Sequence, residues 1–277
     1  MERMSDWWYV PRMSVSTRFE GMERLLGVEA ANMVGASHAC IVGIGGVGSW
    51  TAEALARSGI GAITLVDLDD VCVSNTNRQI HALQSTVGQF KVDVMAARVR
   101  GINPDCTVHT ICDFFRATNA DDMLDRGFDV VVDAIDSFRE KAIMVDGCRA
   151  RNIPIVVIGG SGGRVDPTAI QLTDLNKTKN DPLLRRVRKQ LRQKHRFPRG
   201  RTPWGIPAVW CNEMPVYPQS DGTVCRVPEG DNVPGRLDCA TGYGAASFVT
   251  GTAGFFAASA AIRLLTQGTG DDTGALP

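Results

Sequence analysis

The sequence predicts an α/β fold with a mostly parallel sheet, helices on both faces and an antiparallel extension. Short apolar strands alternate with helices over residues 39–158, and this alternation is typical of parallel sheets that are covered on both faces. The alternation stops after Gly159, and two later strand-like runs at 169–173 and 223–227 predict the antiparallel part.

Each element follows from its own pattern. Helix 90–102 carries its apolar residues on one face, as expected for a helix that packs on a sheet. The strands are short apolar runs, and their length separates them from buried helices. Two short helices over 19–34 precede the first strand. The predicted strands are 39–44, 62–67, 106–111, 129–133 and 155–158, and the remaining helices are 47–57, 139–151 and about 245–265.

Composition limits the class of protein. The chain has 277 residues, 44% of them apolar, which is enough for one large domain with its own core. The formal net charge is zero, so any contact with nucleic acid or acidic lipid must come from a local patch. The eight cysteines form no CxxC pair, which argues against a zinc knuckle and favours reduced thiols in a cytoplasmic protein. Residues 1–12 contain no apolar core that would act as a secretion signal.

We expect one domain over residues 18–265, between flexible tails at 1–17 and 266–277. Its boundaries fall where the regular pattern begins and ends. Within the domain we expect a nucleotide-binding core at about 36–160, a basic insertion at about 175–215 and a C-terminal helix at about 242–265.

A glycine-rich loop joins the first predicted strand to the first helix of the core. Its glycines are Gly43, Gly45, Gly46 and Gly48. Glycines at this point let the backbone turn tightly and approach a polyphosphate, whose charge then lies at the helix N-terminus. The loop therefore predicts a Rossmann-like nucleotide site, and taken alone it fits a nicotinamide or flavin enzyme equally well.

Two carboxylates, Asp67 and Asp69, end the second predicted strand. A carboxylate roughly 20 residues after the glycines commonly binds a ribose hydroxyl. The strand pattern does not decide which of the two does so. The turn that follows carries Asn75, Arg78 and Gln79.

Two cations and one further acid predict phosphoryl chemistry. Lys91 lies 13 positions after Arg78, and such cations neutralise the charge that builds as pyrophosphate leaves. Asp136, followed by Ser137, comes just after strand 129–133, where a carboxylate suits Mg²⁺ bound to phosphates. The set predicts ATP and Mg²⁺ as cofactors. A nicotinamide oxidoreductase is the weakest reading, since it would leave these side chains without a role.

Together these motifs resemble the ubiquitin-activating-like (ThiF/MoeB-like) adenylyltransferases. Segments outside the shared core resemble the tRNA threonylcarbamoyladenosine dehydratase branch of that family, so the likeness covers about residues 18–265. Carrier-protein adenylyltransferases often carry two CxxC zinc pairs, and their absence here favours the tRNA branch. The segments are RFEG (18–21), NRQIHAL (77–83), DPT (166–168), VYPQSDGTVC (216–225) and DCATGYGAA (238–246).

The resemblance implies an ATP-dependent cyclisation of threonylcarbamoyladenosine in the anticodon loop of tRNA. The threonyl carboxylate would attack the α-phosphate of ATP, and the carbamoyl group would then close onto the activated carbon as AMP leaves. The resemblance assigns the phosphates to Arg78 and Lys91, and Mg²⁺ to Asp136. It also implies that Asn75 and Gln79 shape the adenosine and phosphate pocket.

Arg18 aligns with an arginine that, in relatives of this family, reaches into the active site of the partner subunit. The resemblance therefore implies a homodimer whose sites are completed in trans, as by an arginine finger. A solvated residue that opens a helix is the alternative reading of Arg18.

Cys239 and Cys225 are candidate reactive thiols, because carrier-activating relatives use a cysteine for thioester or persulfide chemistry. Cys239 lies in a Gly-rich segment and is the stronger candidate. A buried structural thiol is the alternative for both.

The predicted insertion is strongly basic. Residues 177–201 contain eleven Lys or Arg and one acid, Asp181. We expect this stretch to follow tRNA phosphates, with a solvated basic helix as the alternative. Trp204 and Trp210 are candidates to stack on unpaired bases, with packing as the alternative. The candidate phosphate-binding residues are Arg185, Arg186, Arg188 and Lys189.

Residues 239–262 contain no charge and are long enough to cross a bilayer. We expect a helix that is buried against the sheet or a dimer, and membrane attachment is the alternative. Two other functions stay open as well. One is adenylation of a ubiquitin-like sulfur-carrier protein, and the other is a non-catalytic nucleotide-binding scaffold for sulfur-relay partners such as a cysteine desulfurase and its sulfur acceptor.

Overall fold

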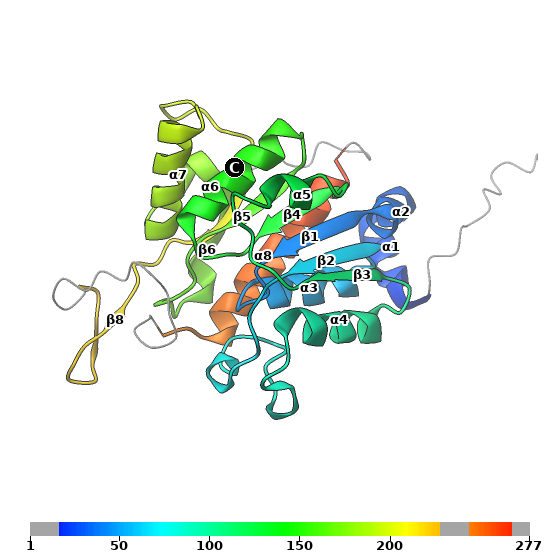
Figure 1. Ribbon diagram of the computed structural model, residues 1–277, viewed down its shortest axis with the longest axis horizontal. Coiled ribbons are helices and arrows are strands. Elements are labelled where there is room, and N and C mark those ends of the chain that lie inside the picture. Colours follow the sequence, from blue (N-terminus) through cyan, green and yellow to red (C-terminus); the bar gives the residue numbers. More distant parts are fainter. Residues whose placement is uncertain (1–16, 228–243, 268–277) are drawn as a thin grey trace, which may run out of the picture.

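A seven-stranded sheet lies at the centre of the molecule (Figure 1). The computed structural model describes residues 17–227 and 244–267. The strand order is β3-β2-β1-β4-β5-β7-β6, and every neighbouring pair is parallel except β6 with β7. The strands are β1 (His38–Val42), β2 (Ala62–Val66), β3 (Thr107–Ile111), β4 (Val130–Asp133), β5 (Ile155–Ile158), β6 (Ile170–Asp174) and β7 (Pro207–Cys211).

Helices cover both faces, so the predicted fold class is confirmed (Figure 1). The first face packs on α2 (Val28–Ala36), α3 (Gly48–Arg57), α4 (Lys91–Ile102) and α8 (Ser247–Leu265). The second face packs on α5 (Ala120–Leu124), α6 (Phe138–Ala150) and α7 (Pro182–Lys194). Side chains of β1 alternate between the two cores, with Ile41 in the first and Cys40 and Val42 in the second. The remaining elements are α1 (Glu20–Leu26), the hairpin strands β8 (Tyr217–Pro218) and β9 (Val224–Cys225), and 3-10 turns at Thr17–Phe19, Val73–Asn75, Gln84–Thr86, Pro167–Ala169 and Leu175–Lys177.

The antiparallel part differs from the predicted one. The run at 169–173 becomes β6, but the run at 223–227 supplies only β9, which pairs with β8 away from the main sheet. Strand β7, fully buried between β5 and β6, was not predicted. It follows the basic segment and begins with a proline, which hides its strand character in the sequence.

Helix α8 packs against α3 through small residues. A Cβ at Gly254 would lie 2.6 Å from the Trp50 Cβ and 2.9 Å from the Val47 carbonyl oxygen. The Thr51 hydroxyl donates to the Gly254 carbonyl oxygen at 3.3 Å. By length and mean hydropathy (1.5) α8 could cross a membrane, but 56% of its apolar window is buried within the fold. This helix therefore closes the core over the sheet.

Candidate active site

The glycine-rich loop lies where β1 has β2 on one side and β4 on the other. Ligands of open α/β sheets bind at such a switch point, beyond the carboxyl ends of the strands. Gly43 has φ +91°, and a Cβ there would lie 2.9 Å from the Ala134 carbonyl oxygen. A Cβ at Gly48 would lie 1.8 Å from the Gly43 carbonyl oxygen. Only glycine fits these two positions, because the turn brings backbone against backbone.

The other two glycines of the loop are less confined by protein. Among the described residues, the atom nearest to a Cβ at Gly45 would be Nε2 of Gln79, at 4.0 Å. A Cβ at Gly46 would lie 3.2 Å from the Thr250 methyl group. The open space at Gly45 suits close approach of a phosphate to the backbone.

The structure separates the two carboxylates at the end of β2. Asp67 is buried, with Oδ2 accepting the Ile44 N–H at 2.6 Å and Oδ1 accepting the Asp69 N–H at 2.9 Å. Burial raises the pKa of Asp67, although Lys91 and the two backbone donors oppose this effect. The Asp69 side chain is 53% exposed and accepts from the Lys91 Nζ at 2.8 Å. Asp67 is therefore hydrogen-bonded to the loop at Ile44, and Asp69 pairs with Lys91.

Lys91 and Arg78 reach the loop from different elements. Lys91 is buried at the N-terminus of α4. The Arg78 carbonyl oxygen accepts from the Trp50 indole and the Thr250 hydroxyl, each at 3.1 Å. Its guanidinium donates to the Ser74 carbonyl oxygen at 2.7 Å. These contacts tie the backbone of the 73–79 turn to α3 and α8.

Asn75 shapes this turn from within. Its side chain is buried, and Oδ1 accepts the Cys72 N–H at 3.0 Å. The Asn75 carbonyl oxygen accepts the N–H of Gln79 at 2.9 Å. The turn thereby places the Gln79 side chain against Gly45.

Three buried polar atoms around the loop have no hydrogen-bond partner among the residues that the structure describes. They are Ser49 Oγ, Gln79 Oε1 and His81 Nδ1. The other ring nitrogen of His81 contacts the Ile44 carbonyl oxygen at 2.9 Å, and burial lowers the pKa of His81 to about 4. Buried polar atoms normally carry a partner. Their position fits a site that receives the polar groups of a nucleotide.

Asp136 is exposed in the turn between β4 and α6. A buried ion pair links the two ends of that turn. Lys141 Nζ in α6 lies 2.9 Å from Asp133 Oδ1 and 3.0 Å from the carbonyl oxygen of Asp133 at the end of β4. Burial raises the pKa of Asp133 despite this partner. The Ser137 hydroxyl donates to the Glu140 carboxylate.

The oxygen donors of the site fit Mg²⁺ bound largely through phosphates. The described residues contain no group of three or more His, Cys, Asp or Glu side chains that could hold a metal alone. A single carboxylate beside a triphosphate suits Mg²⁺, which keeps several water ligands and binds substrate phosphates. Asp136, two residues after Ala134, is the carboxylate that the sequence predicts for this ion.

Some predicted residues lie apart from this site. Arg18 is exposed before α1, and the neighbouring Phe19 packs on Gly59, at the opposite edge of the sheet from the glycine loop. Cys225 is exposed in β9. Cys239 lies outside the described residues, as do most of the two predicted tails.

The two candidate tryptophans pack against other side chains of the protein, Trp210 buried and Trp204 half-buried. Trp210 is buried in β7, and its indole donates to the Thr173 hydroxyl at 2.9 Å. Trp204 lies edge-on to Phe197, with ring centroids 4.9 Å apart. The packing alternative therefore holds for both.

Sequence reasoning missed two features of the site. His81 contacts the loop, but a lone histidine within NRQIHAL carries no signal of its own. The Asp133–Lys141 pair joins residues eight positions apart on different elements. Its signal, a charged residue at the end of an apolar strand, is shared with many surface turns.

Comparison with known proteins agrees with this geometry. Residues 21–275 match the model of the ThiF family. A tRNA threonylcarbamoyladenosine dehydratase of Escherichia coli is 51% identical over 89% of this chain and 92% of its own length. The dehydratase of Haemophilus influenzae is 45% identical over 90% of this chain and 94% of its own length. The chain belongs to the ThiF family.

Solved structures give the same result. A structure described as TcdA (CsdL) superposes with a TM-score of 0.83 at 48% identity, covering 91% of this chain and 97% of its own. The E. coli tRNA N6-threonylcarbamoyladenosine dehydratase in complex with ATP superposes with a TM-score of 0.79 at 45% identity, covering 91% of this chain and 96% of its own. The predicted resemblance to the dehydratase branch is confirmed.

Proposed function

We propose that this chain is an ATP-dependent tRNA threonylcarbamoyladenosine dehydratase. The observation that carries the proposal is a relative of this fold, 45% identical over 91% of the chain, that binds ATP. The glycine loop, with Asp67, Lys91 and Asp136 around it, supplies the groups that an adenylation reaction needs.

The geometry supports separate roles for the two carboxylates of β2. Asp67 is bonded to the loop at Ile44, so it would hold the ribose next to the phosphates. Asp69 would keep Lys91 oriented until the phosphates take up its ammonium group. Arg78, Asn75 and Gln79 would complete the pocket.

The reaction would proceed in two steps. A carboxylate oxygen of the threonyl group attacks the α-phosphorus of ATP, and pyrophosphate leaves. The carbamoyl group of the same nucleotide then attacks the activated carbonyl carbon. AMP leaves with the electron pair of the broken C–O bond, and a carbamoyl N–H proton passes to water. The net change is the loss of water from the modified nucleotide. The protein supplies orientation and charge stabilisation, with Lys91 and Arg78 on the phosphates. Mg²⁺ at Asp136 would neutralise phosphate charge.

The homodimer is part of the proposal, because Arg18 lies too far from its own glycine loop to act there. An apolar groove of about 470 Å³ adjoins α1, the helix that follows Arg18, and is lined by Met22, Leu25 and Phe255, among others. Exposed apolar surface of this kind suits a partner subunit. In this proposal a second copy packs on α1 and α8 and supplies its Arg18 to the first copy's site.

Substrate RNA would meet the basic face of α7 through Arg185, Arg186 and Lys189, which are exposed. Arg188 instead points inward and donates to the Thr178 hydroxyl. Because α8 is packed into the core, we place the enzyme in the cytoplasm rather than on a membrane.

The experiment is mass spectrometry of tRNA nucleosides after incubation with purified protein, ATP and Mg²⁺. We expect threonylcarbamoyladenosine to be converted into a product lighter by one water. Unchanged nucleoside, together with pyrophosphate exchange that requires a carrier protein ending in Gly-Gly, would contradict the proposal and favour carrier adenylation.

A further inference from the structure

The basic side chains of α7 form two rows. Arg188 and Arg192 face the protein and donate to Thr178 and Asn176 respectively. The outer row is exposed and makes no hydrogen bond or ion pair with residues that the structure describes. This outer row consists of Arg185, Arg186 and Lys189.

Arg186 of the outer row and Arg139 of α6 both make cation–π contacts with the ring of Phe138. The Arg186 Cζ lies 4.5 Å from the centroid of the Phe138 ring, and the Arg139 Cζ lies 5.6 Å from it. Both distances fall within the roughly 6 Å range of cation–π contacts. Neither guanidinium has a carboxylate partner within the described ranges 17–227 and 244–267. A stacked guanidinium keeps its in-plane N–H groups available to acceptors.

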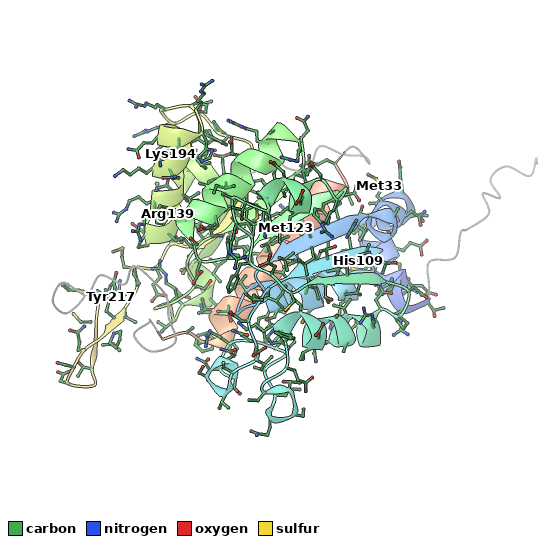
Figure 2. All side chains as sticks on the ribbon, viewed as in Figure 1. Met33, His109, Met123, Arg139, Lys194 and Tyr217 are labelled. Atoms are coloured by element: carbon green, nitrogen blue, oxygen red, sulfur yellow. The ribbon has the colours of Figure 1, made fainter. Side chains whose placement is uncertain are left out.

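This pair lies at the border of the candidate active site. Phe138 is the first residue of α6 and follows Asp136 by two positions. The N-terminus of a helix adds partial positive charge at the same place. In Figure 2 Arg139 is labelled between α6 and α7, and Lys194 is labelled at the far end of α7. The basic surface therefore begins beside the site and continues along α7.

We propose that Arg139 and Arg186, held on Phe138, bind the phosphate backbone of the substrate RNA next to the nucleotide that is modified. Arg185 and Lys189 extend this contact along α7. The inference rests on the proposed function, because it assigns the RNA of that reaction to a surface. It also adds Arg139, which lies outside the basic segment that the sequence singled out.

Two arguments favour RNA as the occupant over an acidic protein. Backbone phosphates repeat at regular intervals, so they match a continuous row of unpaired cations. The modified nucleotide of the tRNA must also unstack from its neighbours to reach the ATP site. The RNA backbone next to it must be held in place while it does so. A contact that starts two residues from Asp136 holds the strand where this is needed.

The test compares two double variants that each remove two exposed arginines. Arg139→Ala with Arg186→Ala removes the proposed contact. Arg100→Ala with Arg126→Ala is the matched control, since both side chains are exposed and lie outside α6, α7 and the groove between α1 and α8. Binding of tRNA carrying threonylcarbamoyladenosine is measured by filter binding at several salt concentrations, and ATP affinity is measured by titration of the same samples.

We expect the first double variant to bind tRNA about 10- to 30-fold more weakly at low salt, with the slope of log K against log salt reduced by about 1.5. ATP affinity should stay within twofold of wild type, and the control should match wild type in both measurements. Arg139→Lys with Arg186→Lys should restore the salt slope. Lysine returns both positive charges, although it lacks the planar guanidinium group.

Four results would overturn the inference. One is tRNA affinity and salt slope that equal those of the control. Another is a parallel loss of ATP affinity, which would indicate general damage to the site. A third is weaker tRNA binding with an unchanged salt slope, which would indicate a contact that is not made to backbone phosphates. In each of these cases wild type still cyclises tRNA. The fourth, wild type that binds no tRNA at all, would remove the proposed function as well.

Discussion

The carboxyl edge of the sheet has two halves that are built in different ways. Around β1 and β2, the site consists of backbone turns and buried polar groups, such as Asp67 bonded to the Ile44 N–H. Around α6 and α7, the proposed RNA-binding surface consists of exposed side chains, such as Arg139 and Arg186 on Phe138. The first half suits a rigid nucleotide held by backbone contacts, and the second suits a long polyanion. Changes in the first half should therefore alter ATP chemistry, and changes in the second should alter RNA binding.

The largest effect is expected at Lys91. Lys91→Ala should lower ATP–pyrophosphate exchange by more than about 1,000-fold, because the charge on the departing pyrophosphate would lose its buried cation. Exchange is measured with tRNA carrying threonylcarbamoyladenosine. Arg100→Ala, an exposed change at the other end of α4, is the control and should keep normal exchange. Near-normal exchange in Lys91→Ala would refute the assigned role.

The second-largest effect is expected at Gly48. Gly48→Ala would place a Cβ 1.8 Å from the Gly43 carbonyl oxygen, so the loop must move, and ATP affinity should fall by about 100-fold. Gly101→Ala is the matched control, since a Cβ there meets no atom of the described residues within 4 Å. It should leave ATP affinity unchanged and stabilise α4 by up to about 1 kcal/mol. Equal ATP affinity in the two variants, measured by titration, would show that the loop does not bind ATP.

The smallest effect concerns pH and His81. Its pKa is lowered from 6.5 to about 4 in the folded protein, so the unfolded chain takes up the proton first as pH falls. The contribution of His81 to stability is therefore complete above pH 6.5 and declines toward pH 4, by at most about 3 kcal/mol. Urea unfolding should show a shallower pH dependence for His81→Gln than for wild type over this window. Parallel curves for the two proteins would mean that His81 is not buried against the loop.

The sequence indicated the glycine loop of the first half and the basic residues of the second, but not the contact that joins α6 to α7. The glycine loop and the end of β2 depend on neighbours close in the chain, so their spacing alone indicates the site. Strand β7 was missed because its place between β5 and β6 depends on pairing across the sheet. The contact of Arg139 and Arg186 with Phe138 forms only because α6 packs against α7. No local sequence pattern predicts that packing.

The residues of the nucleotide half also show a limit of local reasoning. The sequence could not separate Asp67 from Asp69, because both follow the same strand. Burial and bonding separate them, since Asp67 accepts two backbone N–H groups and Asp69 accepts from Lys91. The remote position of Arg18 likewise follows from the packing of Phe19 on Gly59, which local sequence does not reveal.

The most direct test of the central claim is to follow ATP and the modified nucleotide in one reaction. Purified protein is incubated with Mg²⁺, tRNA carrying threonylcarbamoyladenosine and ATP labelled in its α-phosphate. We expect one AMP for each nucleotide cyclised and no ADP. ADP as the product, or cyclisation without cleavage between the α- and β-phosphates, would contradict it.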